Sequence, residues 1–368
     1  MKPHVSSISP CFQGAAAGCR SAGTAVGGVL APRGTIMALL TRVAISGHVK
    51  TALGLGLVVL LCALMTRVPR SRQSSSDTDE PASFSPFDSV ELRDGSKIPL
   101  VGYGTGGRTS TDLTKRYNGV RAALAAGMRH IDTAQRYGDE EEVGRAIRDS
   151  GVPRQSIWLT TKLDSFAANG PETVYETLAS INASVARLAT SYIDLVLLHS
   201  PFHSQRMVQW RALLQARDAG IVRFVGVSNH MPRHITDIKR LGLELPTVNQ
   251  IELHPWLPSN EEVVAFCQAH GIAVEGYGVL GPTNRWEDPM LRAIALAHDA
   301  TVPQVILTWH VQRHHIPIFG TDSPEHLQSN LHIGDFELSE AEMRQVNGLA
   351  GSDDIYSYTV SKAAANWP

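Results

Sequence analysis

The stretch "PLVGYGTGGRTSTD", Pro99–Asp112, decides between two folds for this chain. Its three glycines, Gly102, Gly104 and Gly107, spell G-x-G-x-x-G after an apolar run, and the acidic residue Asp132 closes the next apolar run. This order of features is typical of the dinucleotide-binding turn of a doubly wound sheet, in which the acid binds the ribose. The same letters also fit a loop above the first strand of a barrel.

The position of the following helix separates the two interpretations. In a doubly wound sheet the third glycine lies within the first helix and packs it against the strand. Here four residues separate Gly107 from Asp112, and Thr111 or Asp112 is the expected helix N-cap. The glycines are therefore predicted to lie in a loop above a strand, which leaves Asp132 free for another role.

Short apolar runs alternate with helix-like stretches along the rest of the chain. Eight strand candidates are Pro99–Gly104, His130–Ala134, Ile157–Leu163, Tyr192–Ser200, Arg223–Asn229, Val248–His254, Ala273–Leu280 and Ile316–Gly320. Eight strand–helix pairs over about 280 residues predict an α/β fold, the (β/α)₈ TIM barrel, over residues 89–368. Before the first of them, Asp94-Gly95 between two short apolar runs predicts a β-hairpin at the bottom of the barrel.

The N-terminal region has a different composition. Residues 1–76 contain no Asp or Glu, so residues 1–50 form a basic, acid-free leader typical of organelle-targeting sequences. Residues 51–66 are an uncharged hydrophobic segment, and residues 67–88 are predicted to be a disordered linker. Three explanations of the hydrophobic segment stay open: a membrane anchor, a targeting core, or an early start codon with Met37 as the alternative. The expected location is accordingly membrane-anchored or organelle-targeted, and otherwise cytoplasmic.

Composition limits the function classes. A formal net charge of -2 offers no basic field for phosphates, so nucleic acid is not an expected partner. Of four cysteines only Cys267 falls in the barrel, which indicates a domain that needs no disulfides. His310, His314 and His315 lie close in sequence without Cys or carboxylate neighbours, so no metal site is predicted.

Four polar residues lie at or just beyond the carboxyl ends of predicted strands, where barrels place their chemistry. They are Asp132, Tyr137, Lys162 and His199. A lysine ammonium beside a tyrosine stabilises the phenolate and lowers its pKa, a carboxylate keeps that lysine charged, and an imidazole can orient a carbonyl. Together they form a set suited to protonating a carbonyl oxygen.

The motifs around these residues resemble the aldo-keto reductase family. In the family's order the chain has "GMRHIDTAQRYGDEEEVGRAI", "LTTKL", "YIDLVLLHSP", "GVSN", "VNQIELHPWLP", "LTWHVQ" and "DFELSEAEM". The resemblance extends over about residues 90–350. It implies a barrel that binds a nicotinamide cofactor, NADPH or NADH, across its rim.

The resemblance also implies residue roles. Tyr137 matches the family's proton donor, Lys162 and Asp132 its pKa-lowering pair, and His199, with Tyr137, its substrate-binding residues. The implied cofactor-binding residues are Gly104, Thr105, Asp132, Ser228, Asn229, Gln250, Tyr277, Leu280, Thr321 and Asn330. Among these, Ser228, Asn229 and Gln250 match residues that hold the carboxamide, and Tyr277 matches the ring that stacks on the nicotinamide.

The chain departs from the family's pattern at the cofactor phosphate and in the pocket. Gly320 and His326 stand where a lysine and an arginine usually grip the 2′-phosphate of NADP, which predicts a reduced preference for NADPH over NADH. Gly106 and Ser200 replace frequent tryptophans, which predicts a roomier, less aromatic pocket. The tail after Ala350 is short, so a curtailed C-terminal specificity loop is expected.

Two functions from different classes follow from these observations. The first is NAD(P)H-dependent reduction of an aldehyde or ketone to an alcohol, by an oxidoreductase acting on CH–OH groups as a monomer. The alternative is a membrane-tethered, cofactor-binding redox sensor with slow turnover, for which the segment 51–66 is the supporting feature.

Overall fold

The computed structural model describes residues 84–107, 112–166, 170–351 and 354–366. All of them belong to one compact unit, Ser75–Pro368. The predictions for the leader, for the hydrophobic segment 51–66 and for most of the linker lie outside the described residues. Within the described ranges, no helix has the length and apolar character needed to cross a membrane.

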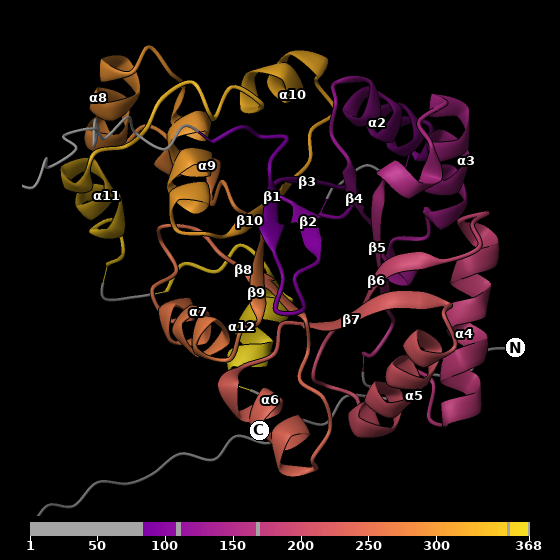
Figure 1. Ribbon diagram of the computed structural model, residues 1–368. Helices are drawn as coiled ribbons and strands as arrows, with labels where there is room; N and C mark the ends of the chain where they lie inside the picture. Colours follow the sequence, from indigo (N-terminus) through magenta and orange to yellow (C-terminus); the bar gives the residue numbers. More distant parts are fainter. Residues whose placement is uncertain (1–83, 108–111, 167–169, 352–353, 367–368) are drawn as a thin grey trace, which may run out of the picture. The chain divides into compact units, whose positions relative to one another are not determined.

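Eight parallel strands close into a barrel in the order β10-β3-β4-β5-β6-β7-β8-β9, which confirms the predicted fold. Figure 1 shows the helices arranged as a ring around these strands. The strands are β3 (Gly102–Gly104), β4 (His130–Asp132), β5 (Trp158–Leu163), β6 (Ile193–Leu198), β7 (Val222–Ser228), β8 (Val248–Glu252), β9 (Ala273–Tyr277) and β10 (Ile316–Phe319). Each coincides with one of the eight apolar runs.

The helices follow the strands in the expected alternation. They are α2 (Leu113–Ala125), α3 (Glu140–Ser150), α4 (Val174–Arg187), α5 (Arg206–Asp218), α6 (Pro232–Arg240), α7 (Asn260–Ala269), α8 (Pro289–Ala297), α9 (Val302–Gln312), α10 (Pro324–Asn330), α11 (Glu340–Asn347) and α12 (Thr359–Asn366). Side-chain caps fix several of their starts. Thr173, Thr301 and Ser339 each form a reciprocal capping box at the beginning of α4, α9 and α11.

The glycine-rich stretch lies where the barrel interpretation placed it. Gly102 and Gly104 belong to strand β3, and Gly107 follows in the loop with a φ of 73°. Helix α2 begins only at Leu113, with the Asp112 side chain accepting a hydrogen bond from the Thr114 amide. Because the third glycine lies outside the helix, the stretch is no doubly wound fingerprint.

The predicted hairpin covers the amino end of the barrel. Strands β1 (Ser89–Glu91) and β2 (Lys97–Pro99) pair antiparallel, and in Figure 1 they lie across the centre of the ring. Leu92 and Ile98 pack into a buried cluster with Trp158, Val248 and Ile316, which are the first residues of three barrel strands. The opposite end of the barrel, where the strands finish, therefore remains available for a site.

The folded part begins before the hairpin. Phe84 packs against the main core, and the Asp88 amide donates a hydrogen bond to the Ser85 carbonyl. The last five residues of the predicted linker, 84–88, thus pack on the barrel domain instead of connecting to it loosely.

Candidate active site

A cavity of about 690 Å³ opens at the carboxyl ends of the barrel strands. Nine of the predicted residues line it: Gly104, Asp132, Tyr137, His199, Ser228, Asn229, Gln250, Tyr277 and Leu280. They come from strands far apart in sequence, or from the loops that follow those strands. The closure of the sheet brings them to one place.

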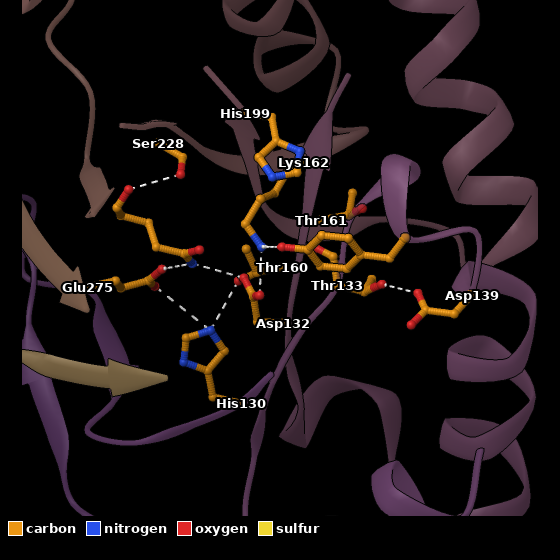
Figure 2. Close-up of polar contacts among 12 residues, drawn as sticks. His130, Asp132, Thr133, Asp139, Thr160, Thr161, Lys162, His199, Ser228 and Glu275 are labelled. Atoms are coloured by element: carbon orange, nitrogen blue, oxygen red, sulfur yellow. Dashed lines mark hydrogen bonds and ion pairs between the residues drawn. The ribbon is translucent and has the colours of Figure 1, made fainter. Parts of the chain in front are cut away.

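Lys162 connects the two acidic groups of the predicted catalytic set. Its Nζ donates to Asp132 Oδ1 at 2.6 Å, to the Thr133 carbonyl at 3.0 Å and to the Tyr137 hydroxyl at 3.4 Å. Figure 2 shows the Lys162 side chain pointing toward the Asp132 carboxylate. Lys162 is only 1% exposed, so its ammonium has exchanged water for these three acceptors.

The charges inside this group shift the pKa values in ways that can be traced. Burial acts to lower the pKa of Lys162, but the Asp132 charge and hydrogen bond outweigh it, and the pKa is raised. The lysine therefore stays charged. For Tyr137, burial raises the pKa and Lys162 opposes that rise without reversing it. The expected lowering is thus wrong in its net direction, although the contribution of Lys162 itself has the predicted sign.

The short segment between β4 and α3 holds the Tyr137 ring in place. Tyr137 ends the 3₁₀ helix η1 (Gln135–Tyr137), and Gly138 closes it with a φ of 67°. On the other side, a Cβ atom at Gly106 would lie 2.5 Å from the ring carbon that bears the hydroxyl. The space that a larger residue at position 106 would occupy is taken by Tyr137 itself.

His199 lies beside the tyrosine at the end of β6. Its ring meets the Tyr137 ring edge-on at 5.6 Å and the Phe166 ring at 5.2 Å. Burial, with the charges of Lys162 and Arg136, lowers the pKa of His199 well below its usual value, so the imidazole is neutral. Its Nδ1 is buried and has no hydrogen-bond partner among the described residues. A neutral imidazole on the cavity wall suits the orientation of a carbonyl oxygen.

Asn229 organises the adjoining part of the wall, directly after strand β7. Its backbone has a φ of 61°, a conformation that asparagine tolerates better than most residues. Its Nδ2 donates to the His199 carbonyl at 3.1 Å and to Ser228 Oγ at 3.0 Å, and its Oδ1 accepts from the Tyr277 hydroxyl at 2.6 Å. These bonds fix the Tyr277 hydroxyl, and the residue lines the cavity.

Gln250 binds two carboxyl groups through its amide nitrogen. Its Nε2 donates to Asp132 Oδ2 at 2.9 Å and to Glu275 Oε2 at 2.7 Å. Both amide hydrogens are thereby used by carboxyl groups, so only Oε1 could meet a carboxamide. Sequence reasoning missed Glu275, because it lies inside the apolar run of β9 and no motif surrounds it.

Four predicted residues lie off the cavity wall. Lys162 is behind Asp132 and Tyr137, and Thr105 is fully buried with an Oγ1 that has no partner among the described residues. The Thr321 carbonyl accepts a hydrogen bond from the Tyr103 hydroxyl, and its Oγ1 accepts from the Ser323 amide. Asn330 is buried in α10.

Several aromatic rings line the cavity. Besides Tyr137 and Tyr277 its rings are Phe166, Trp286, Phe319 and Tyr358. Phe166 and Trp286 follow β5 and β9, so the rule that barrel loops after strands carry the site could have found them. Tyr358 comes from the C-terminal tail, and no sequence signal indicated it. It meets the Tyr277 ring edge-on at 5.3 Å, so the short tail does reach the cavity.

These residues fit a nicotinamide cofactor on structural grounds. The cavity is large enough for the nicotinamide end of a dinucleotide, and His199 on its wall has a ring nitrogen without a partner among the described residues. The Tyr277 side chain lines the cavity, and Gly104 and Gly106 leave another part of its wall without side chains. Within the described ranges no three His, Cys, Asp or Glu side chains are placed to hold a metal ion.

Comparisons with known proteins agree with this geometry. The family model for the aldo/keto reductase family matches residues 100–350. An aldo-keto reductase of Mycolicibacterium smegmatis is 42% identical over 263 residues, which cover 71% of this chain and 92% of the relative. A protein of Trypanosoma cruzi named 9,11-endoperoxide prostaglandin H2 reductase is 35% identical over 266 residues, 72% of this chain and 92% of its own length.

The solved structures that this chain resembles are also aldo-keto reductases. An aldo/keto reductase from Brucella melitensis has a TM-score of 0.66 at 38% identity, covering 72% of this chain and 99% of its own. An aldo-keto reductase from Bombyx mori in complex with NADP has a TM-score of 0.67 at 31% identity, covering 73% and 94%.

Proposed function

This chain is a member of the aldo/keto reductase family, and we propose that it reduces an aldehyde or ketone to an alcohol with Tyr137 as the proton donor. One observation carries the proposal. The Tyr137 hydroxyl lies 3.4 Å from Lys162 Nζ, which is 2.6 Å from Asp132, and the ring adjoins His199 on the wall of the large cavity.

A bound nicotinamide cofactor supplies the hydride, and the chain supplies the rest. His199, neutral because it is buried, can donate one N–H to the carbonyl oxygen and hold it near Tyr137. The Tyr137 hydroxyl then gives its proton to the oxygen as negative charge develops there. Lys162, kept charged by Asp132, stabilises the resulting phenolate. The apolar side chains of the wall lower the local dielectric constant, which strengthens each of these electrostatic contacts.

The raised pKa of Tyr137 favours the reduction direction. A phenol that stays protonated through neutral pH is ready to donate, whereas oxidation of an alcohol requires the phenolate. The same reasoning gives the burial of these four residues, the tetrad Asp132, Tyr137, Lys162 and His199, a role in catalysis. Burial keeps the proton on Tyr137, and Lys162 lowers the energy of the phenolate that forms when the proton is transferred to the substrate.

For the cofactor we propose NADPH use with reduced discrimination against NADH. The relatives solved with NADP support a nicotinamide cofactor, while this chain has exposed Gly320 and His326 where the family usually has two cations. Ser323, the N-cap of α10, uses its hydroxyl to accept from the His326 amide and to donate to Glu325. A carboxylate so close to the expected phosphate position weakens the 2′-phosphate preference further.

The test is cofactor oxidation measured against a panel of aldehydes and ketones, with wild type and Tyr137→Phe in parallel. The substitution keeps the ring and removes only the hydroxyl that carries the donated proton, so turnover should fall by at least ~10²-fold while cofactor binding survives. Retention of most of kcat by Tyr137→Phe would contradict the assignment. Tethering to a membrane, a targeting leader and a monomeric state remain predictions, addressed by fractionating the native protein, sequencing its N-terminus and measuring its mass in solution.

A further inference from the structure

A second carboxyl group lies next to the Asp132–Lys162 pair, inside the barrel. Glu275 in β9 is fully buried, and the single amide group of Gln250 bridges it to Asp132, at 2.7 Å and 2.9 Å. Figure 2 shows Glu275, Asp132 and Lys162 in one continuous set of polar contacts. Glu275 is therefore connected to the Tyr137 hydroxyl by a series of side-chain hydrogen bonds, through Gln250, Asp132 and Lys162.

The surroundings of Glu275 offer it little support as an anion. Strand β8 contributes the neutral Gln250 and β10 the apolar Ile316 beside it in register. From β5, Lys162 spends its three donors on Asp132, the Thr133 carbonyl and Tyr137. From β4 come the Asp132 carboxylate, a like charge, and His130.

His130 does not supply the missing cation. Its Nε2 lies 3.8 Å from Glu275 Oε1, beyond hydrogen-bonding distance, and is 3.1 Å from Thr160 Oγ1. Burial and the Lys162 charge lower the pKa of His130 to about 3, so its ring is neutral. Glu275 Oε1 has no hydrogen-bond partner among the described residues. Burial and the Asp132 charge accordingly raise the pKa of Glu275 to about 8.

The protonation state of Glu275 decides the net charge around the proton donor. With Glu275 protonated, Asp132 and Lys162 balance each other. With Glu275 ionised, the cluster carries one extra negative charge in a region that excludes water. That charge opposes the negative charge which develops on the Tyr137 oxygen as its proton leaves.

We propose that Glu275 is a positioning residue for the reaction, which keeps the tetrad neutral while it holds its proton and suppresses proton donation by Tyr137 when it loses that proton to solvent. Glu275 transfers no proton to the substrate and acts through Gln250, Asp132 and Lys162. The proposal rests on the proposed carbonyl reduction, and it adds a fifth ionisable residue and a pH response to it.

The experiment compares the pH dependence of kcat for wild type and Glu275→Gln at saturating cofactor and carbonyl. Glutamine imitates the protonated carboxyl, so Glu275→Gln should match wild type near pH 7. Above about pH 8 the wild-type kcat should fall by roughly tenfold, and the variant should hold its plateau to higher pH. Loss of a merely structural contact would instead lower kcat by one factor at every pH.

A matched control is Glu140→Gln. Glu140 is also a buried carboxylate, but its partners are Thr161, Ser184 and Arg187, outside the barrel interior. Whatever happens to its overall rate, this variant should keep the wild-type midpoint of the alkaline decline. A profile that loses the decline in both variants, or in neither, overturns the proposal.

A second measurement needs no variant and no activity. In wild type labelled with ¹³C at glutamate carboxyls, one resonance should titrate near pH 8. Glutamate resonances that all titrate below about pH 6 overturn the proposal, even when Glu275→Gln fails to fold. A wild type inactive on every carbonyl contradicts the proposed function and this proposal together. An active wild type whose alkaline decline survives in Glu275→Gln contradicts this proposal alone.

Discussion

Replacing Gly106 by alanine should displace Tyr137, the proposed proton donor, without unfolding the barrel. The added Cβ would lie 2.5 Å from the Tyr137 ring carbon that bears the hydroxyl and 2.7 Å from the hydroxyl oxygen, whereas ordinary contacts begin at 3.4 Å. The ring must therefore retreat by roughly 0.9 Å, the difference between 3.4 and 2.5 Å. Misplacement of a reacting group by about 1 Å can cost ~10² in rate, so kcat should fall about a hundredfold.

The assay for Gly106→Ala is steady-state carbonyl reduction, with cofactor affinity and the free energy of unfolding measured on the same preparations. Gly348→Ala is the matched control, because Gly348 caps α11 at a φ of -74° and its added Cβ meets only helix carbonyls, at 3.3 and 3.4 Å. That control should keep the wild-type kcat. A wild-type kcat in Gly106→Ala, with the alanine shown to be present, would refute the claim that Gly106 fixes the position of Tyr137.

The remaining predictions concern the tetrad and the cofactor. Tyr137→Phe should lose at least ~10² in kcat and retain cofactor binding, as followed by cofactor fluorescence. Lys162→Met should lose activity and about 3–5 kcal/mol of unfolding free energy, because it leaves the buried Asp132 carboxylate without its cation. Adding Asp132→Asn to that variant should restore part of the stability, because it removes the unpaired charge. Gly320→Lys with His326→Arg should raise the kcat/KM ratio of NADPH over NADH by about tenfold or more, and an unchanged ratio would place the 2′-phosphate elsewhere. Glu275 should also make unfolding pH-dependent. The pKa of Glu275 is about 8 in the folded state, against 4.5 in the unfolded chain. Its contribution to the free energy of unfolding is therefore complete below about pH 4.5 and is lost as pH rises through about 8. The difference corresponds to roughly 5 kcal/mol at ~1.36 kcal/mol per pH unit, and urea unfolding of Glu275→Gln should lack it.

Two features of the pocket depend on side chains that are distant in sequence. From the sequence, Gly106 predicted a roomier pocket, and the short tail predicted a curtailed C-terminal loop. In the structure, Tyr137 fills the space at Gly106, and Tyr358 from the tail stands against Tyr277. In both cases a side chain distant in sequence occupies the volume that a missing one leaves. A sequence shows which atoms are absent at a position, but it does not show which others pack there.

By itself, the sequence predicted the fold and the four residues that we propose as the catalytic tetrad, Asp132, Tyr137, Lys162 and His199. Strand and helix periods are local properties, so eight alternating segments predicted the barrel, and Asp132, Lys162 and His199 could be placed at strand ends because parallel strands finish on one rim. Only the tertiary structure decided how charge is distributed inside. In the sequence, Glu275 lies in an apolar run like any core position. It comes close to Asp132 only because the barrel closes, which brings β4 and β9, about 140 residues apart, near enough for Gln250 to donate hydrogen bonds to both carboxyl groups. Burial and pairing set a pKa, and both are properties of the folded chain.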